Sequence, residues 1–351
     1  MPIQKVSFEE TLGRMVVGRG LCVGCASCVV SCPFKCLEYF NGNPKIVGEC
    51  KACGICAQIC PRFNFSMPQL EEFVFGRKRK PEEEFGIYKR IIAARATSDK
   101  VLRVCQDGGV VTSLLISALD EGLIDGAALS YESPEEPLRA TPRLALTKDD
   151  ILGSAGTRYT YSPNILALNE GVQRKAGKLA FVGTPCQIHA LRRMQMLPLK
   201  KYADAVKFLV GLFCSESFTY DGLVKGLLLG KLGVKPEEVV GINIKGKVLL
   251  KMRSGEVRAV SLKEIRDYAC AFCSACPDFS AELADISVGG LGLEGWSLTI
   301  VRTDIGEEVF RRAELSGAVR VKPLEDARII DLLIRMSRRK RETSARFYGS
   351  A

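Results

Sequence analysis

Eight of the fifteen cysteines form two copies of one run, Cys-x2-Cys-x2-Cys-x3-Cys-Pro, the second copy starting 28 residues after the first. This spacing is typical of bacterial-type ferredoxins with two 4Fe-4S clusters, in which the fourth cysteine of each run ligates the other cluster. We therefore predict one cluster on Cys22, Cys25, Cys28 and Cys60, and a second cluster on Cys50, Cys53, Cys56 and Cys32.

Two other chemistries use several cysteines, and both fit the spacing less well. A structural zinc site takes four ligands and usually draws them from two close pairs. A disulfide framework suits short secreted chains, and this chain has 351 residues. The two runs thus favour iron-sulfur clusters, and with them the transfer of single electrons.

A second group of cysteines lies in the later part of the chain. Cys186 and Cys214 each follow a predicted buried strand, and Cys270, Cys273 and Cys276 form a Cys-x2-Cys-x2-Cys-Pro run. Side chains at the ends of separate strands can converge on one site, so five cysteines for four positions suggest a third cluster. The alternative is that Cys186 and Cys214 are buried structural thiols and that only the 270–276 run binds a ligand.

Two polar loops are candidates for binding an anionic cofactor. Gln106-Asp107-Gly108-Gly109 opens an apolar helix with Thr112 and Ser113 in its first turn, and glycine-opened helix starts bind phosphate. A glycine turn without a ligand would have the same sequence. The hydroxyl-rich loop Gly156-Thr157-Arg158-Tyr159, running on to Pro163, could bind a ring system and pair with phosphate, or be an ordinary turn.

Further along, the segment 278–290 predicts a short strand that ends in glycines, and His189 is expected to pack or hydrogen-bond rather than catalyse. No Gly-x-Gly-x-x-Gly fingerprint opens a predicted helix in this chain, which argues against a conventional dinucleotide fold. If the one-electron carriers exchange electrons with a two-electron hydride carrier, a flavin is needed between them.

The elements that must position these residues fall into an α+β arrangement. We expect a two-cluster ferredoxin-like domain over 1–68, an exposed charged linker over 69–86, an α/β cofactor domain with its own cluster over 87–320, and a basic helical tail over 321–351. Strands are predicted over 90–96, 125–131, 178–182 and 206–213. Helices are predicted over 109–121, after Thr147 and from Pro185, with a hairpin or meander over 240–260.

Bulk properties narrow the partners. A net charge of +10 favours anionic ligands, but the aromatic residues are not interleaved with the basic ones, which disfavours nucleic acid. No apolar run is long enough to span a bilayer. Fifteen cysteines behind a polar, unpatterned N-terminus predict a reducing cytoplasm. The basic run 338–341 follows an apolar helical stripe, which fits a helix packed on the body as well as a binding role.

At these same motifs the sequence resembles the beta-subunit family of coenzyme F420-reducing hydrogenase, whose hydride carrier is a deazaflavin. The shared motifs are Ala94-Arg-Ala-Thr97, Gln106-Asp-Gly-Gly-Val-Val-Thr112, Gly156-Thr-Arg-Tyr-Thr160, Pro185-Cys-Gln187, Gly211-Leu-Phe-Cys214, Lys245-Gly-Lys247, Cys273-Ser-Ala-Cys276 and Ala284-Asp-Ile-Ser-Val-Gly289. With a ferredoxin-like N-terminus, the chain is most similar to the electron-input subunit of F420H2 dehydrogenase, and also to the N-terminal part of F420-dependent sulfite reductase.

The resemblance implies FAD, coenzyme F420 as substrate, and a third cluster on Cys186, Cys214, Cys273 and Cys276, leaving Cys105 and Cys270 without a role. It places Gly108, Gly109, Thr112, Ser113, Gly156, Thr157, Arg158 and Tyr159 around the flavin, and Lys245 and Lys247 near anionic F420. Electrons would then leave to a partner complex, which could be embedded in a membrane. Two alternatives stay open: a reductase of the same fold with another hydride donor or substrate, and a polyferredoxin-like electron adaptor without catalysis.

Overall fold

A computed structural model describes residues 5–197, 199–244 and 246–349 of the chain. Its N-terminal part is built from short elements around the two cysteine runs. These are η1 (Glu9–Val17), α1 (Ser27–Val30), the antiparallel strands β1 (Leu37–Phe40) and β2 (Asn43–Ile46), α2 (Ile55–Ile59) and α3 (Met67–Phe75). The cysteines themselves make up much of the buried interior here, so little apolar core would exist without them.

An eight-stranded mixed sheet forms the body of the molecule, in the order β13-β3-β12-β11-β7-β6-β4-β5. Its central strands β4, β6, β7 and β11 run parallel. The strands are β3 (Arg90–Ala96), β4 (Gly126–Glu132), β5 (Ala140–Ala145), β6 (Leu179–Gly183), β7 (Val206–Leu212), β11 (Ile286–Gly289), β12 (Ser297–Val301) and β13 (Val319–Lys322).

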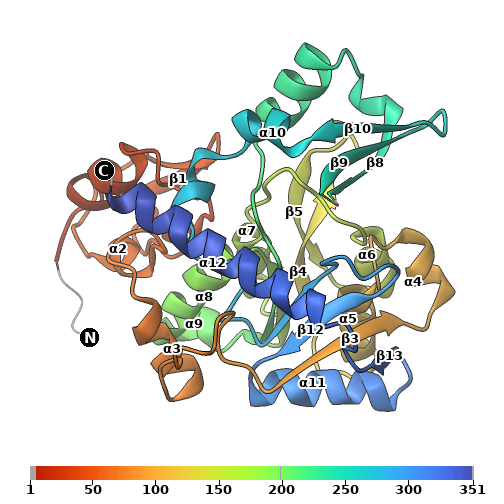
Figure 1. Cartoon of the computed structure of the whole chain (residues 1–351). Coiled ribbons are helices and arrows are strands. Elements are labelled where there is room, and N and C mark those ends of the chain that lie inside the picture. The colour runs from red at the N-terminus through yellow and green to blue at the C-terminus, as the bar shows by residue number, and fades with distance from the viewer. Residues whose placement is uncertain (1–4, 198, 245, 350–351) are drawn as a thin grey trace.

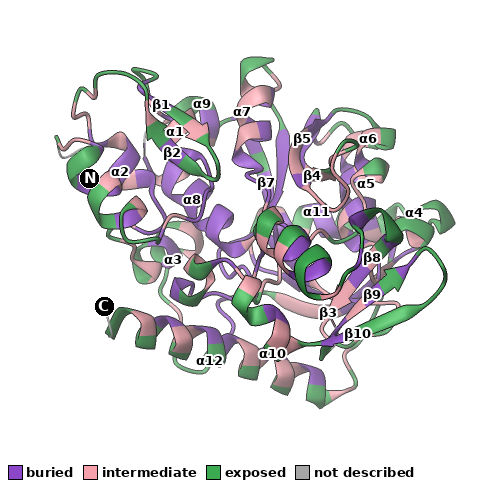
Figure 2. Cartoon of the chain, turned by 90° about the horizontal axis from the view of Figure 1, so that it is seen from above, coloured by how far each residue is buried: buried purple, intermediate pink, exposed green. Residues whose placement is uncertain are grey.

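Helices cover both faces of this sheet, and its central strands are accordingly rich in buried apolar residues. Along β6, Ala180 and Val182 pack on the face that carries α5 (Val110–Asp120) and α11 (Asp304–Leu315). Leu179 and Phe181 pack on the opposite face, in one core with α7 (Ile165–Gln173) and α8 (Pro185–Met196). Figure 2 shows the strands around β7 buried between these layers.

A second, three-stranded antiparallel sheet stands at one side of the body (Figure 1). It consists of β8 (Val239–Ile244), β9 (Lys247–Met252) and β10 (Val257–Ser261). It packs on η2 (Asp221–Lys231) through a separate apolar core. The shorter helical elements are α4 (Asp99–Val104), α6 (Lys148–Gly153), α9 (Lys200–Ala203), η3 (Pro236–Glu238), α10 (Leu262–Ile265), η4 (Arg266–Tyr268) and η5 (Ala271–Ala275).

The long helix α12 (Ala327–Gly349) crosses the molecule from the large sheet to the N-terminal part, as Figure 1 shows. Its buried positions lie three to four residues apart, at Ile329, Leu333, Ser337, Lys340 and Ser344. This spacing gives the helix one continuous packed face. The basic C-terminal segment is therefore packed on the body, and no helix in the described part of the chain is long and apolar enough to cross a membrane.

Most predicted elements are confirmed within one or two residues, including the capping box of Thr147 with Asp150 and the meander over 240–260. The prediction of an exposed connector is confirmed for only part of the charged linker, because residues 76–78 and 80–82 are exposed but several other residues of 69–86 are not. Leu70, Glu71 and Phe85 are buried, and α3 packs against α8. The charges of this segment bind residues on other elements, so it joins the two halves firmly.

Candidate functional site

The first predicted cysteine set lines one cavity in the N-terminal part. Cys22, Cys25, Cys28 and Cys60 line this cavity together with Arg62 and mostly apolar side chains. Gly24 adopts φ +62°, and a Cβ there would lie 2.5 Å from the carbonyl oxygen of Gly42, so only glycine allows this loop to close. The backbone N–H of Gly24 donates to Cys22 Sγ at 3.4 Å.

The second set, Cys32, Cys50, Cys53 and Cys56, lines a second cavity. Each cavity thus takes three cysteines from one run and the fourth from the other run, which is the exchange that the spacing predicts. Cys36 is a fifth member that the ferredoxin spacing does not predict. It is buried in the second cavity, with its Sγ 3.4 Å from Cys32 Sγ. Its position four residues after Cys32 is the sequence feature that could have indicated its place in this cavity.

The third set converges from three parts of the chain. Cys186 is the second residue of α8, Cys214 follows β7, and Cys273 and Cys276 lie in and directly after η5. These cysteines lie close enough that Cys273, Cys186 and Cys276 all raise the pKa of Cys214. Cys270 is buried beside Cys273 and Cys186, so five cysteines meet here.

All three sets hold thiols that resist ionisation on their own. Burial raises the pKa of Cys22 to about 12, of Cys25 to about 11, of Cys186 to about 11 and of Cys273 to about 12. The thiolate is the form that ligates metals, so a bound cationic centre must supply the energy of deprotonation. Cysteines gathered in this way therefore suit a metal cluster better than a reactive nucleophile.

The spread of the sulfur atoms separates a cluster from a single ion. Among the described residues, no three Cys, His, Asp or Glu side chains converge closely enough to hold one metal ion. A cubane binds each cysteine through a different iron, so its ligands stand around a volume instead of meeting at a point. Four cysteines around each of the two cavities are the donor set that a 4Fe-4S group takes.

Cationic side chains brace the third set from two sides. Lys340 on α12 donates to the carbonyl oxygens of Ser215 at 2.8 Å and Cys273 at 2.9 Å. Arg62 from the N-terminal part donates to the carbonyl oxygen of Ala275 at 2.8 Å and of Phe272 at 3.4 Å. Both side chains are more than nine-tenths buried, so the two halves of the chain share this site.

The predicted glycine turn lies against β3 and β12, two inner strands of the large sheet. A Cβ on Gly108 would lie 2.6 Å from the carbonyl oxygen of Ala94 and from the amide of Ser297, and Gly109 adopts φ +69°. Gly109 is the N-cap residue of α5, and no side chain caps the N–H groups of the first turn of this helix. Thr112 and Ser113 are buried in that turn, so their side chains face the core.

The loop 156–159 lies beside this turn, where Gly156 approaches the carbonyl oxygen of Val104. Gly156 and Thr157 are exposed. Arg158, predicted to pair with a phosphate, instead donates to carbonyl oxygens of its own loop at Ser154, Ala155 and Gly156. Burial raises the pKa of Tyr159 to about 12, and the nearby Asp107 carboxylate also raises it.

The small sheet reaches the same region. Gln106 of the glycine turn donates from its side-chain amide to the carbonyl oxygen of Ile242 on β8 at 3.2 Å. Lys247 is exposed as the first residue of β9. Lys245, the other predicted contact of an anionic ligand, lies outside the described residues.

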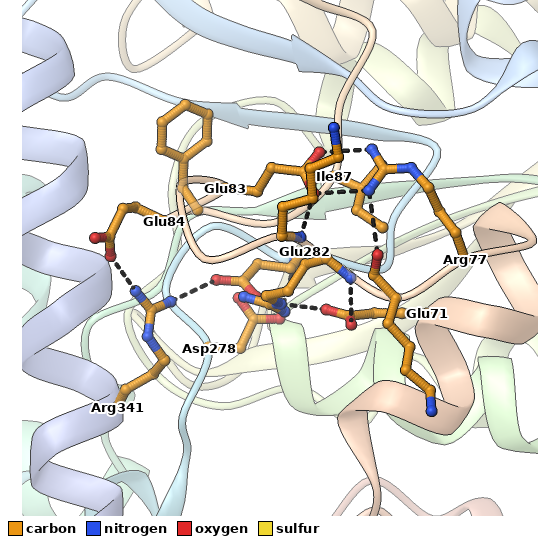
Figure 3. Close-up of polar contacts among 12 residues, drawn as sticks. Glu71, Arg77, Glu83, Glu84, Ile87, Asp278, Glu282 and Arg341 are labelled. Carbon is orange, nitrogen blue, oxygen red and sulfur yellow. Dashed lines mark hydrogen bonds and ion pairs between the residues drawn. The ribbon is translucent and has the colours of Figure 1, made fainter.

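An ionic network around the buried carboxylates of Glu71 and Glu282 fixes the linker between the halves, as Figure 3 shows. Arg79 of the linker pairs with Glu71 on α3 and with Glu282, which lies in the loop before β11. Arg341 on α12 also reaches Glu282, at 3.3 Å, and Glu84 at 2.9 Å. His189 bonds Asp278 at 2.8 Å and stacks on Phe65, the packing role that the sequence predicts for it.

Two family models cover most of the second part of the chain. The model of the N-terminal region of the coenzyme F420 hydrogenase/dehydrogenase beta subunit matches residues 91–169, and the model of its C-terminal region matches residues 176–327.

Relatives carry the same names. The chain is 39% identical over 263 residues to the beta subunit of the coenzyme F420 hydrogenase of Methanothermobacter thermautotrophicus, covering 73% of this chain and 92% of that one. It is 28% identical over 340 residues to a subunit of the F(420)H(2) dehydrogenase of Methanosarcina mazei, covering 92% and 91%. A chain in the F420-reducing [NiFe] hydrogenase complex from Methanosarcina barkeri superposes with a TM-score of 0.74 at 33% identity, covering 78% and 95%. The chain belongs to the coenzyme F420 hydrogenase/dehydrogenase beta-subunit family.

Proposed function

We propose that this protein oxidises reduced coenzyme F420 by hydride transfer to FAD and passes the electrons singly through three 4Fe-4S clusters to a partner redox complex. The observation that carries the proposal is the exchange of Cys32 and Cys60 between the two cavities. Two-cubane ferredoxins require this exchange, while zinc sites and disulfides do not. Family membership supplies F420 as the hydride carrier.

The N-terminus of α5 would bind a phosphate of the FAD. Its first-turn N–H groups lack a capping side chain, and the exposed Gly156 and Thr157 border it. Gly108 and Gly109 have no side chains, so the backbone of this turn lies close to β3 and β12. When bound, FAD supplies the conversion between a two-electron hydride and one-electron carriers.

The small sheet would attract the substrate. Reduced F420 is an anion, and Lys247 presents an exposed ammonium group at the start of β9. Gln106, which bonds β8, links this sheet to the turn that would hold the flavin.

The second cavity would be the exit to the partner. Phe34, which lines this cavity, and Phe40 and Val47 around the neighbouring hairpin are each about half exposed. Exposed apolar side chains grouped near a redox site suit docking of another protein. The relatives named as subunits of a hydrogenase and a dehydrogenase support a partner complex.

The proposal is tested by anaerobic turnover. Cluster-replete protein loaded with FAD is mixed with reduced F420 and an artificial one-electron acceptor, and the return of the visible absorbance of F420 is followed. We expect oxidation that depends on added FAD. Absence of oxidation by protein with full iron and flavin content would exclude F420 as its substrate and favour another hydride donor, while failure to take up flavin at all would favour an electron adaptor.

A further inference from the structure

Arg62 occupies the boundary between the first and third cysteine sets. Its side chain lines the cavity of Cys22, Cys25, Cys28 and Cys60, and only 8% of the residue is exposed. Its guanidinium also bonds the carbonyl oxygens of Phe272 and Ala275, inside the 270–276 cysteine run. One charged group therefore contacts both redox sites.

The Nε–H of Arg62 has no hydrogen-bond partner within the described part of the chain, although it is buried. Buried polar groups are nearly always satisfied, so an orphan donor beside a cavity points to an acceptor in that cavity. Apart from the Ser27 hydroxyl, the lining residues offer cysteine sulfurs and apolar side chains, and a cubane would add sulfides that accept hydrogen bonds.

The buried guanidinium of Arg62 stands between the first and third cysteine sets, because it lines the cavity of one and bonds the backbone of the other. Its positive charge would favour added electrons on either side.

Packing places the first site in the middle of the three. Cys25 of the first set and Cys186 of the third belong to one apolar core, with Tyr161 packed on it and its hydroxyl 3.9 Å from Cys186 Sγ. Cys28 of the first set and Cys56 of the second set belong to one buried cluster.

We infer that Arg62 is a positioning residue that links the third site to the first site in the electron path, and that its Nε–H donates to a sulfur of the cluster in the first site. This inference rests on the proposed function. Electrons would pass from the third site to the first site and then to the second site, with Arg62 between the third site and the first. Loss of a positive charge and of a hydrogen bond to sulfur lowers the reduction potential of a cluster.

The test is an anaerobic, EPR-monitored redox titration of the full chain with its clusters in place, comparing the wild type with Arg62→Gln and Arg62→Lys. In Arg62→Gln we expect the first-site cluster to become harder to reduce by about tenfold in its equilibrium constant, a shift of ~59 mV for a one-electron couple. Arg62→Lys keeps the charge but loses the Nε–H, and we expect a smaller shift in the same direction. Iron content should not change in either variant.

A matched control is Lys51→Gln, because Lys51 is exposed and lines the second cavity. Any shift in this control should be confined to the second cluster. Unchanged potentials in both Arg62 variants, or an equal shift of all three clusters, would overturn the inference and leave the proposed function intact. If Arg62→Gln loses iron, the test depends on Arg62→Lys alone. A wild-type reduction potential in that variant would contradict the proposed hydrogen bond from the Nε–H of Arg62. A wild type without a cluster at the first site would overturn both proposals.

Discussion

The ammonium group of Lys340 lies 2.9 Å from the carbonyl oxygen of Cys273, although 67 residues separate the two in the chain. The same group bonds the carbonyl oxygen of Ser215, next to Cys214. Lys340 also lowers the pKa of Cys273, against the larger opposing effect of burial. The C-terminal helix therefore helps to build the third cysteine site.

Lys340→Met should weaken that site selectively. Two buried carbonyl oxygens would lose their donor, which costs about 1–3 kcal/mol each, and the thiols would lose a charge that favours their ionisation. We expect a lower unfolding temperature and loss of about one third of the iron, since one of the three proposed 4Fe-4S clusters is affected. Arg339→Met is the control, because Arg339 is exposed on the same helix; equal iron in the two variants would contradict the role of Lys340.

Cys36 and Cys32 should be interchangeable as ligands. Their sulfur atoms are 3.4 Å apart, so both can reach the same iron of a cluster. We expect Cys36→Ala and Cys32→Ala each to keep the full iron content, and the double variant to lose the second cluster. Iron analysis with EPR spectroscopy measures this. Loss of the cluster in Cys32→Ala alone would show that Cys36 cannot replace Cys32.

Stability should depend on pH through Glu282. Burial, followed by the nearby Asp278 carboxylate, raises the pKa of Glu282 from the ordinary 4.5 to about 7. The folded state therefore binds more protons than the unfolded state between these values, and the contribution to stability is present below pH 4.5 and lost as pH rises through 7. The loss amounts to at most about 3 kcal/mol.

Chemical denaturation at pH 5, 6, 7 and 8 measures this dependence, with Glu282→Gln as the comparison. The glutamine variant keeps the size of the side chain and has no proton to release, so we expect a flatter profile over this range. Glu83→Gln is the control, because Glu83 pairs with Arg77 and its pKa is lowered to about 2. Identical slopes for the wild type and Glu282→Gln would contradict the assignment.

Lys247→Glu should raise the Michaelis constant for reduced F420 while leaving the FAD content unchanged. Lys247 is exposed at the start of β9, and reversing its charge replaces attraction of an anionic substrate with repulsion. We expect an increase of about threefold to tenfold that shrinks as salt is added. Lys251→Glu, at the far end of the same strand, controls for net charge; equal Michaelis constants in the two variants would remove Lys247 from the substrate site.

Local patterns predicted the elements of this chain well. Val110 to Asp120 is helical where the apolar run begins after two glycines, and Thr147 caps its helix as the Thr-x-x-Asp pattern indicates. The cysteine runs carry their own pairing rule, so even the exchange of Cys32 and Cys60 could be predicted. Each of these signals lies within a short stretch of sequence.

Contacts between distant segments could not be predicted in the same way. Nothing near Arg62 indicates that it bonds Ala275, and the basic run around Lys340 has the composition of a solvated face. The contacts of the charged linker were missed for the same reason, because Arg79 pairs with a residue on the loop before β11 and Glu84 pairs with a residue on α12. Such contacts depend on which surfaces meet after the sheet has formed.

The most direct measurement adds reduced F420 anaerobically to protein loaded with FAD and iron, with no other electron acceptor present. Each hydride carries two electrons, and the only carriers available to take them are the flavin and the clusters. We expect the visible absorbance of oxidised F420 to return while EPR signals of reduced 4Fe-4S clusters grow. Flavin reduction with clusters that stay oxidised, although dithionite reduces them, would contradict the electron path from hydride to cluster.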